Sequence, residues 1–233
     1  MEYLKKTGGF VGLSKMLGDT FDLYDNMHMF LSKERDYKAL MNDLEVDFND
    51  DLIKSIVAHI KEIDGVIISD YGKGICSDLL LKKVISTSNE SNIPIFVDPK
   101  GSDWEKYQHA NLITPNIKEA EIILGEKLVC DEDFEKAGEK ICSTFDIEAC
   151  LITRGGDGMS FFCKDNTFHL KSNAKEIFDV SGAGDTVIST MASGLVMNLT
   201  YKQAAEFSNR AAGIVVGHIG SSAITTRELL NLN

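Results

Sequence analysis

Short apolar runs that look like strands alternate with amphipathic stretches of helical period from residue 49 to residue 217. The clearest run, Val66-Ile67-Ile68, is β-branched, as expected for a strand buried in a parallel sheet. Such alternation indicates a mainly parallel sheet with connecting helices on both faces. The chain has 233 residues, a length that suits one large α/β domain or two small ones.

The expected elements follow one another through this region. Strands are expected at residues 66–68, 94–97, 112–114 and 149–153, with a hairpin formed by 159–163 and 167–170. Helices are expected at about 49–63, 77–86, 118–124, 132–143, 186–197 and 201–217. Residues 1–48 are less readable and give only a helix near 13–17 and some strand near 21–31. The chain is therefore divided into an N-terminal segment, 1–48, and an α/β core, 49–233.

Composition argues against several classes of protein. The chain is 43% hydrophobic and 26% charged, which is ordinary for a globular domain. No apolar run reaches the roughly 18 residues needed to span a bilayer, and the N-terminus lacks an apolar signal core. The five cysteines are scattered without CxxC spacing, which favours a reducing cytoplasm over zinc or disulfides. The net charge of −12 argues against nucleic acid or a membrane surface as partner.

Polar and charged groups gather where the expected parallel strands end. Ligands bind at the carboxyl ends of such strands, so these groups are candidates for one common site. They are Asp70, Lys73, Asp98, Lys100, Asn116, Thr153 and Arg154. The two lysines could offset the charge of a substrate, or could be ordinary exposed lysines. The two aspartates could cap strand ends or contact a ligand.

Residues 179–186, Asp-Val-Ser-Gly-Ala-Gly-Asp-Thr, form a small-residue turn at the start of an expected helix. Backbone N–H groups at a helix start lack partners and carry about half a positive charge, which favours phosphate. Gly182, Ala183 and Gly184 leave room for that approach. Asp185 would repel a resting phosphate but could take a proton from an attacking hydroxyl, as phosphoryl transfer to an alcohol requires. The alternative is an aspartate favoured by the helix dipole alone.

Two further motifs have both a structural and a functional interpretation. Asn116 and Glu119 stand three positions apart at a helix start, where they could organise water around Mg²⁺ on a phosphate chain or form a capping box. The Gly-rich loop 153–158 could admit a nucleotide, with Thr153 or Arg154 near phosphate, or could be a flexible turn. The chain has no GxxxxGK[ST] motif and no GxGxxG after an early strand.

Together these motifs resemble those of the ribokinase/PfkB carbohydrate kinases. Residues 179–186 resemble the second family motif, 116–119 its NxxE motif, and 153–158 its nucleotide loop. More narrowly, three segments resemble the kinase domain of bifunctional ADP-heptose synthases, namely residues 69–74, 97–101 and 112–116. The resemblance covers about residues 60–225. It implies a ribokinase-like three-layer α/β/α fold and ATP-dependent phosphorylation of D-glycero-β-D-manno-heptose 7-phosphate at O1, a step in lipopolysaccharide core synthesis.

The resemblance also implies a role for each matching position. Asp185 would be the general base, and the backbone of residues 182–184 would form the anion hole for the transferring group. Asn116 and Glu119 would act on Mg²⁺-phosphate, the carboxylate through water. The residues expected to bind the nucleotide are Asn116, Glu119, Thr153, Arg154, Gly155, Gly158, Asp179 and Asn209. Those expected to bind the sugar are Asp70, Lys73 and Lys100.

The N-terminal segment departs from the family pattern. Family members begin with a strand that bears a sugar-contacting Asp and a Gly-Gly motif followed by Asn, whereas no such Asn follows Gly8-Gly9. The lid or sugar-binding region in residues 1–48 is therefore expected to be short or degenerate, and no nucleotidylyltransferase domain is expected after Asn233. ATP and Mg²⁺ are the expected ligands, and the resemblance suggests a homodimer formed through the lid.

Several alternatives stay open at this point. One is a truncated, non-catalytic nucleotide-binding module, because residues 1–48 match the family poorly. Another is a kinase of the same fold for another sugar, a nucleoside or a vitamin. Dependence on a monovalent cation and the oligomeric state are also open. Asn209 could line an adenine site, or its small neighbours could simply reflect close helix packing.

Overall fold

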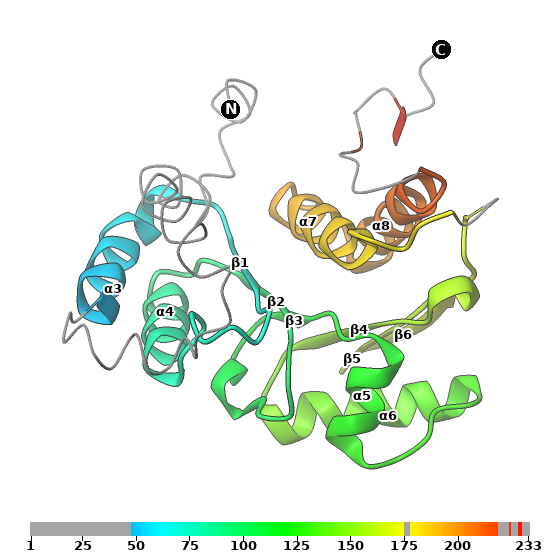
Figure 1. The fold of residues 1–233 in the computed structure, drawn as a ribbon, viewed down its shortest axis with the longest axis horizontal. Helices are drawn as coiled ribbons and strands as arrows, with labels where there is room; N and C mark the ends of the chain where they lie inside the picture. Colours follow the sequence, from blue (N-terminus) through cyan, green and yellow to red (C-terminus); the bar gives the residue numbers. More distant parts are fainter. Residues whose placement is uncertain (1–47, 175–177, 219–223, 225–227, 230–233) are drawn as a thin grey trace, which may run out of the picture.

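The computed structural model describes residues 48–174, 178–218, 224, 228 and 229. A six-stranded sheet lies between two layers of helices (Figure 1). Its strands lie side by side in chain order, and they are β1 (Val66–Ser69), β2 (Ile95–Asp98), β3 (Leu112–Ile113), β4 (Ala149–Thr153), β5 (Met159–Cys163) and β6 (Asn166–Leu170). The first four strands pair in parallel, and the β5–β6 hairpin adds two antiparallel strands.

Helices cover both faces of this sheet. On one face lie α3 (Phe48–His59) with its 3-10 extension η1 (Ile60–Glu62), α4 (Asp78–Glu90), α5 (Ile117–Leu124) and α6 (Asp131–Phe145). The opposite face is covered by α7 (Ala183–Val196) and α8 (Tyr201–Val215), at the top of Figure 1. Two short 3-10 turns complete the described elements, η2 (Glu105–Tyr107) and η3 (Gly155–Asp157). The expected three-layer α/β/α fold is therefore confirmed.

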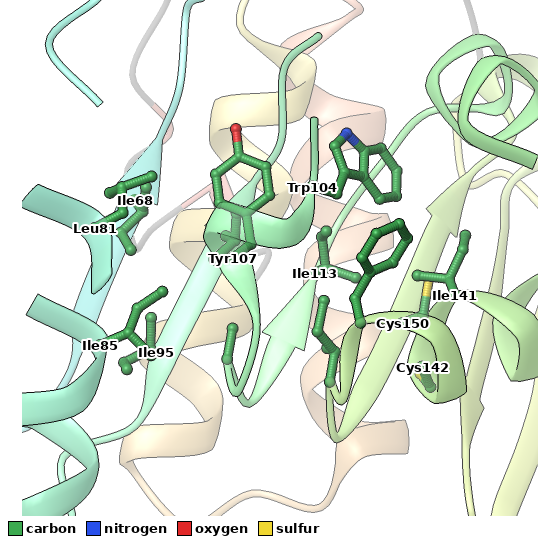
Figure 2. Close-up of a cluster of buried hydrophobic side chains, with 14 of the residues drawn as sticks. Ile68, Leu81, Ile85, Ile95, Trp104, Tyr107, Ile113, Ile141, Cys142 and Cys150 are labelled. Atoms are coloured by element: carbon green, nitrogen blue, oxygen red, sulfur yellow. The ribbon is translucent and has the colours of Figure 1, made fainter. Parts of the chain in front are cut away.

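The core forms because successive strand residues point to opposite faces of the sheet. Ile68, Ile95 and Ile113 face the α3–α6 layer, where they meet Leu81, Ile85 and Ile141 (Figure 2). Phe96, Leu112 and Leu151 face α7 and α8 instead. Trp104 and Tyr107, from the β2–β3 connection, are fully buried in the first cluster. Burial on both faces explains why these strands read as continuous apolar runs.

Several helix boundaries differ from the expected ones by one to four residues, those of α7 and α4 among them. Helix α7 begins at Ala183, three residues earlier than the expected Thr186. Gly182 ends the preceding turn in the left-handed region, with φ 77°, and this lets the helix start at the next residue. Helix α4 runs on to Glu90, beyond the expected residue 86. The earlier start of α7 puts Asp185 within the first turn of the helix, where its charge is favourable.

The expected elements near residues 13–17 and 21–31 lie outside the described residues, as does the expected lid with its dimer contact. Within the described part of the chain, no helix combines the length and the apolar character that crossing a bilayer requires.

The turn from β4 to β5 gives a test of backbone packing. Gly155 and Gly158 both have positive φ, 58° and 101°. A Cβ at Gly158 would come 1.9 Å from the carbonyl oxygen of Leu170, whereas a Cβ at Gly155 would meet nothing within 4 Å. We expect Gly158→Ala to lower the free energy of unfolding by about 2–4 kcal/mol, from left-handed strain plus overpacking. Gly155→Ala is the matched control and should cost only about 1 kcal/mol, from strain alone. Equal losses for the two variants in urea unfolding would contradict the close approach of Leu170.

Candidate active site

Two neighbouring cavities lie where the parallel strands end and α7 begins. The first, called the acidic cavity here, is lined by Asp70, Tyr71, Asp98, Lys100, Asn116, Glu119 and Asp185, among others. The second, called the glycine-lined cavity, is lined by Gly155, Gly156, Gly158, Val180, Asn209 and Gly213, among others. Thr153 and Gly184 line both cavities. The start of α7 is therefore part of the wall between them.

The first turn of α7 offers free backbone donors to this wall. Ala183 donates its N–H to the carbonyl of Val180, but the N–H groups of Gly184 and Asp185 have no partner among the described residues. Gly184 has no side chain that could cover these groups. Free N–H groups at a helix start attract anions because the helix dipole adds to their own partial charge. The N–H groups of the expected anion site therefore lie at the wall between the two cavities.

The Asp185 carboxylate accepts hydrogen bonds from residues at the end of β1. Tyr71 Oη donates to both carboxylate oxygens, at 3.1 Å to Oδ1 and 3.0 Å to Oδ2. Ser69 Oγ donates to Oδ1 at 3.3 Å. All three side chains are at least partly exposed. The carboxylate is therefore oriented by two neutral hydroxyl groups and remains accessible from the cavity.

Asp98 ends β2 and faces the same cavity without a hydrogen-bond donor among the described side chains. Its Oδ2 is 3.9 Å from the position that a Cβ on Gly184 would occupy. Burial above all, together with the negative charges of Glu119 and Asp185, raises the pKa of the Asp98 carboxyl to about 7, against the opposing effect of Lys100. Asp98 is thus a half-buried acid whose raised pKa favours the protonated form up to nearly neutral pH.

Asn116 and Glu119 are brought together at the start of α5. Asn116 Oδ1 accepts from the backbone N–H of Glu119 at 3.0 Å, and Glu119 Oε2 accepts from the N–H of Asn116 at 3.0 Å. The capping-box interpretation is confirmed. Glu119 Oε1 also accepts from Lys100 Nζ at 2.9 Å, and this bond above all raises the pKa of Lys100. The same residues line the acidic cavity, so the cap also fixes a carboxylate there.

Asp70 lines the acidic cavity, but protein donors occupy its carboxylate. It accepts from Lys106 Nζ at 2.6 Å, from Tyr107 Oη at 2.7 Å and from the Gly72 N–H at 2.7 Å. Burial raises the pKa of this carboxyl, but the hydrogen bonds from Lys106, Tyr107 and Gly72 outweigh it and keep the pKa below its usual value. Asp70 therefore anchors the loop after β1. Lys73, on that loop, is exposed and lines neither of the two cavities.

The expected nucleotide residues divide into three groups, of which the first, Asn116 and Glu119, lines the acidic cavity. Thr153, Gly155, Gly158 and Asn209 line the glycine-lined cavity, and Asn209 Nδ2 also donates to the carbonyl of Lys171 at 2.7 Å. Arg154 and Asp179 line neither of the two cavities.

The Arg154 side chain is engaged elsewhere. Its guanidinium contacts Asp131 at 2.6 Å and Ser160 at 3.0 Å, and it stacks over Phe134 at 4.3 Å. Asp179 accepts from the N–H of Ser181 at 2.8 Å, so it shapes the turn before α7. The structure therefore does not bring the side chains of Arg154 and Asp179 together with the other expected nucleotide residues.

Sequence reasoning missed Tyr71 and Ser69 as partners of Asp185. Both residues are next to Asp70 at the end of a strand, and this position is the only sign in the sequence that they could belong to the site. Tyr71 is 114 positions away from Asp185, so no local pattern links the two. Within the described ranges, no three His, Cys, Asp or Glu side chains are grouped as ligands of a metal ion. A divalent cation in this site would therefore rest largely on ligands from water and phosphate.

Solved structures of sugar kinases share this fold. Phosphofructokinase-2 from Escherichia coli, in complex with potassium, superposes with a TM-score of 0.68 at 19% identity, covering 79% of this chain and 62% of the other. Ribokinase from Arabidopsis thaliana, complexed with ribose and ATP, also gives 0.68 at 19% identity, covering 76% and 58%. At this level of identity, the likeness defines the fold class, which is ribokinase-like.

The sequence itself defines the family. The profile of the pfkB family carbohydrate kinases matches residues 35–227. Bifunctional protein HldE of Histophilus somni is 41% identical over 202 residues, covering 84% of this chain and 42% of the relative. Bifunctional protein HldE of Trichlorobacter lovleyi is 43% identical over 180 residues, covering 77% and 37%. The chain belongs to the pfkB carbohydrate kinase family, and it spans about two fifths of the length of these curated relatives.

The raised pKa of Asp98, the half-buried acid at the end of β2, predicts a pH dependence of stability. The pKa of Asp98 is about 7 in the folded chain, against an ordinary value of 3.8. Between these values the folded state holds a proton that the unfolded state has lost. The resulting stabilisation is complete below about pH 4 and disappears as the pH rises through 7. We expect it to be on the order of 1–3 kcal/mol.

The measurement is urea unfolding at pH 5 and pH 8. Asp98→Asn stays neutral at both pH values, so its free energy of unfolding should fall less between them than that of the wild type. Asp165→Asn, on the exposed β5–β6 turn, is the matched control, because it removes the same charge from a solvated position. If Asp98→Asn and wild type lost equal stability between pH 5 and pH 8, the raised pKa of Asp98 would be wrong.

Proposed function

We propose that this chain is a sugar kinase that transfers the γ-phosphoryl group of ATP to O1 of D-glycero-β-D-manno-heptose 7-phosphate, with Asp185 as general base. One observation carries the proposal. The free N–H groups at the start of α7 lie at the wall between a glycine-lined cavity and an acidic cavity that contains Asp185. A phosphoryl group bound at that wall can reach an alcohol on the other side.

The glycine-lined cavity suits the nucleotide. Gly155 and Gly158 present backbone without side chains, and Val180, Asn209 and Gly213 complete its lining. ATP bound there would extend its phosphates toward Gly184, where the unpartnered N–H groups favour an anion. Thr153 lies at the border of both cavities, where its hydroxyl can contact the phosphate chain.

The acidic cavity suits the sugar. In the proposed step, O1 of the sugar gives its proton to the Asp185 carboxylate and forms a bond to the γ-phosphorus. The bond between the γ-phosphorus and the oxygen that bridges to the β-phosphorus breaks, and ADP leaves with that electron pair. The N–H groups of Gly184 and Asp185 stabilise the negative charge on the transferring group. No protein group forms a covalent bond with the substrate in this step, apart from the proton that Asp185 takes up.

Magnesium fits this arrangement through water. Both Glu119 oxygens already accept protein hydrogen bonds, and the described residues provide no three-ligand metal cluster. Glu119 and Asn116 would therefore hold water ligands of Mg²⁺ while ATP supplies phosphate oxygens, as is usual for this ion. When bound, Mg²⁺ would neutralise charge on the phosphates of ATP. A monovalent cation, which the resemblance leaves open, is tested by varying K⁺ in the assay.

The choice of sugar rests on resemblance. Residues 69–74, 97–101 and 112–116 are similar to the kinase domain of ADP-heptose synthases, and HldE relatives match at about 40% identity over this region. Lys100 in the acidic cavity and Lys73 on the exposed loop after β1 are the proposed contacts for the sugar phosphate. Asp70 would contribute by shaping that loop.

The proposal predicts that D-glycero-D-manno-heptose 7-phosphate stimulates ADP release from Mg·ATP. Asp185→Asn should lower this turnover by on the order of 10²- to 10⁴-fold, because the acceptor hydroxyl loses its base. ATP affinity, measured by calorimetry, should change little, since Asp185 does not line the glycine-lined cavity. Asp165→Asn, remote from both cavities, serves as the control for loss of one negative charge.

The outcomes separate the alternatives. Binding of ATP without turnover on any acceptor would identify a non-catalytic nucleotide-binding module instead. If a panel of alcohols shows turnover on another sugar, a nucleoside or a vitamin, the kinase activity is supported and the heptose is rejected as the substrate. Near-wild-type turnover in Asp185→Asn would reject this residue as the base.

A further inference from the structure

The hydroxyl of Tyr71 is the closest hydrogen-bond donor to the Asp185 side chain among the described residues. Its contacts at 3.1 Å and 3.0 Å span both carboxylate oxygens, whereas Ser69 reaches only Oδ1, at 3.3 Å. Among the described residues, Oδ2 therefore has a single partner. A carboxylate oxygen can accept more than one hydrogen bond, so Oδ2 keeps room for a proton from an alcohol.

The loop that carries Tyr71 is held by a buried anchor. The Asp70 carboxylate, 6% exposed as a residue, accepts from the Gly72 N–H on the loop and from Lys106 and Tyr107 on the β2–β3 connection. Gly72 has a φ of 67°, a left-handed conformation that favours glycine at this turn. Asp70 and Gly72 thus fix the backbone on both sides of Tyr71, and the chain there directs its side chain toward α7.

Packing does not explain where the Tyr71 ring lies. The residue is 63% exposed, which is unusual for a large aromatic residue. Its hydroxyl contact with Asp185 is therefore the main interaction that holds the side chain. Burial of the hydroxyl, followed by the hydrogen bond and the charge of Asp185, raises the pKa of Tyr71, so the group stays a donor across the physiological range.

A neutral donor suits a general base in this cavity. Asp98 and Glu119 add carboxyl groups around Asp185, and a neutral donor orients the Asp185 carboxylate without adding a further charge to the cavity. A lysine in this place would hold the charge more tightly and would weaken it as a base. A tyrosine hydroxyl orients the Asp185 carboxylate and lowers its basicity less than a lysine would.

We infer that Tyr71 is a positioning residue for the general base: with Ser69 it holds Oδ1 of Asp185, so that Oδ2 faces the acceptor hydroxyl. This inference deepens the proposed kinase function and rests on it. In the reaction, Tyr71 shifts onto Oδ1 when the acceptor alcohol donates to Oδ2. Tyr71 touches neither the sugar hydroxyl that reacts nor the phosphoryl group.

The test compares Tyr71→Phe with Tyr201→Phe in the full chain. Tyr201 also donates to a carboxylate, Glu148 Oε1 at 2.7 Å, but lines neither of the two cavities, so it is a matched control. We expect Tyr71→Phe to lower kcat by about 10-fold through misorientation of the base, with the KM for ATP unchanged. The acidic limb of the kcat profile should also move to higher pH, because the ionised base has lost a donor. Tyr201→Phe should match the wild type in all three measurements.

A second measurement needs no turnover. The ionisation of Tyr71 is followed by NMR of ring-labelled tyrosine in the wild type and in Asp185→Asn, with Tyr71→Phe used to assign the signal. The pKa of Tyr71 should fall toward its ordinary value when the Asp185 charge is removed. The signal of Tyr201 should not move.

Each result decides either the positioning role of Tyr71 or the proposed kinase function. If the Tyr71 titration is the same with and without the Asp185 charge, the contact and the positioning role are both rejected. If the titration shifts but Tyr71→Phe keeps wild-type kcat and pH profile, the positioning role is rejected. If the wild type phosphorylates no acceptor, the proposed kinase function fails, and the titration alone then decides whether Tyr71 holds Asp185.

Discussion

The parallel pairing of β1, β2, β3 and β4 is the constraint on which the rest of the site depends. Ser69 pairs in register with Asp98, and the carboxyl ends of the neighbouring strands lie at the same edge. Neighbouring strands lie about 4.8 Å apart, so strand-end side chains become neighbours however distant they are in sequence. Helix α7 then reaches this edge from the opposite layer, and its first turn completes both cavities. Because α7 packs on β1 and β2, loss of the register between these two strands would move Ser69 and Tyr71 away from Asp185.

Local signals in the sequence predict most of this architecture. Apolar runs predict the strands, and helical periods predict α3 to α8. The spacing of three positions between Asn116 and Glu119 predicts the cap of α5. These features can be predicted because each depends on residues within one turn or one strand. The start of α7 predicted from the sequence is three residues too late. Glycine in a left-handed conformation, as at Gly182, occurs both in loops and at helix caps, so the sequence does not fix the first residue of the helix.

The pairing of side chains across the site could not be predicted in the same way. The sequence predicts Asp70 as a candidate sugar contact. Its carboxylate accepts hydrogen bonds from Lys106 and Tyr107, which are 36 and 37 positions away in the chain. Arg154 was expected near phosphate, but it pairs with Asp131 on α6. Residue type and strand-end position show that a polar group lies at the edge of the sheet. They do not show which of several neighbours it will bond, because that choice depends on non-local packing.

Charge balance in the acidic cavity shows how an acidic chain can reduce its own repulsion of an anion. Lys100 is paired with Glu119 and Lys106 with Asp70, so these two lysines offset carboxylates of the protein first. Asp98 holds its proton up to about pH 7, and Asp185 is supported by neutral hydroxyl groups. The negative charge that a phosphate would meet is thereby reduced without a free cation beside Asp185. The free backbone N–H groups at the start of α7 can attract an anion beside Asp185 without adding a charged side chain.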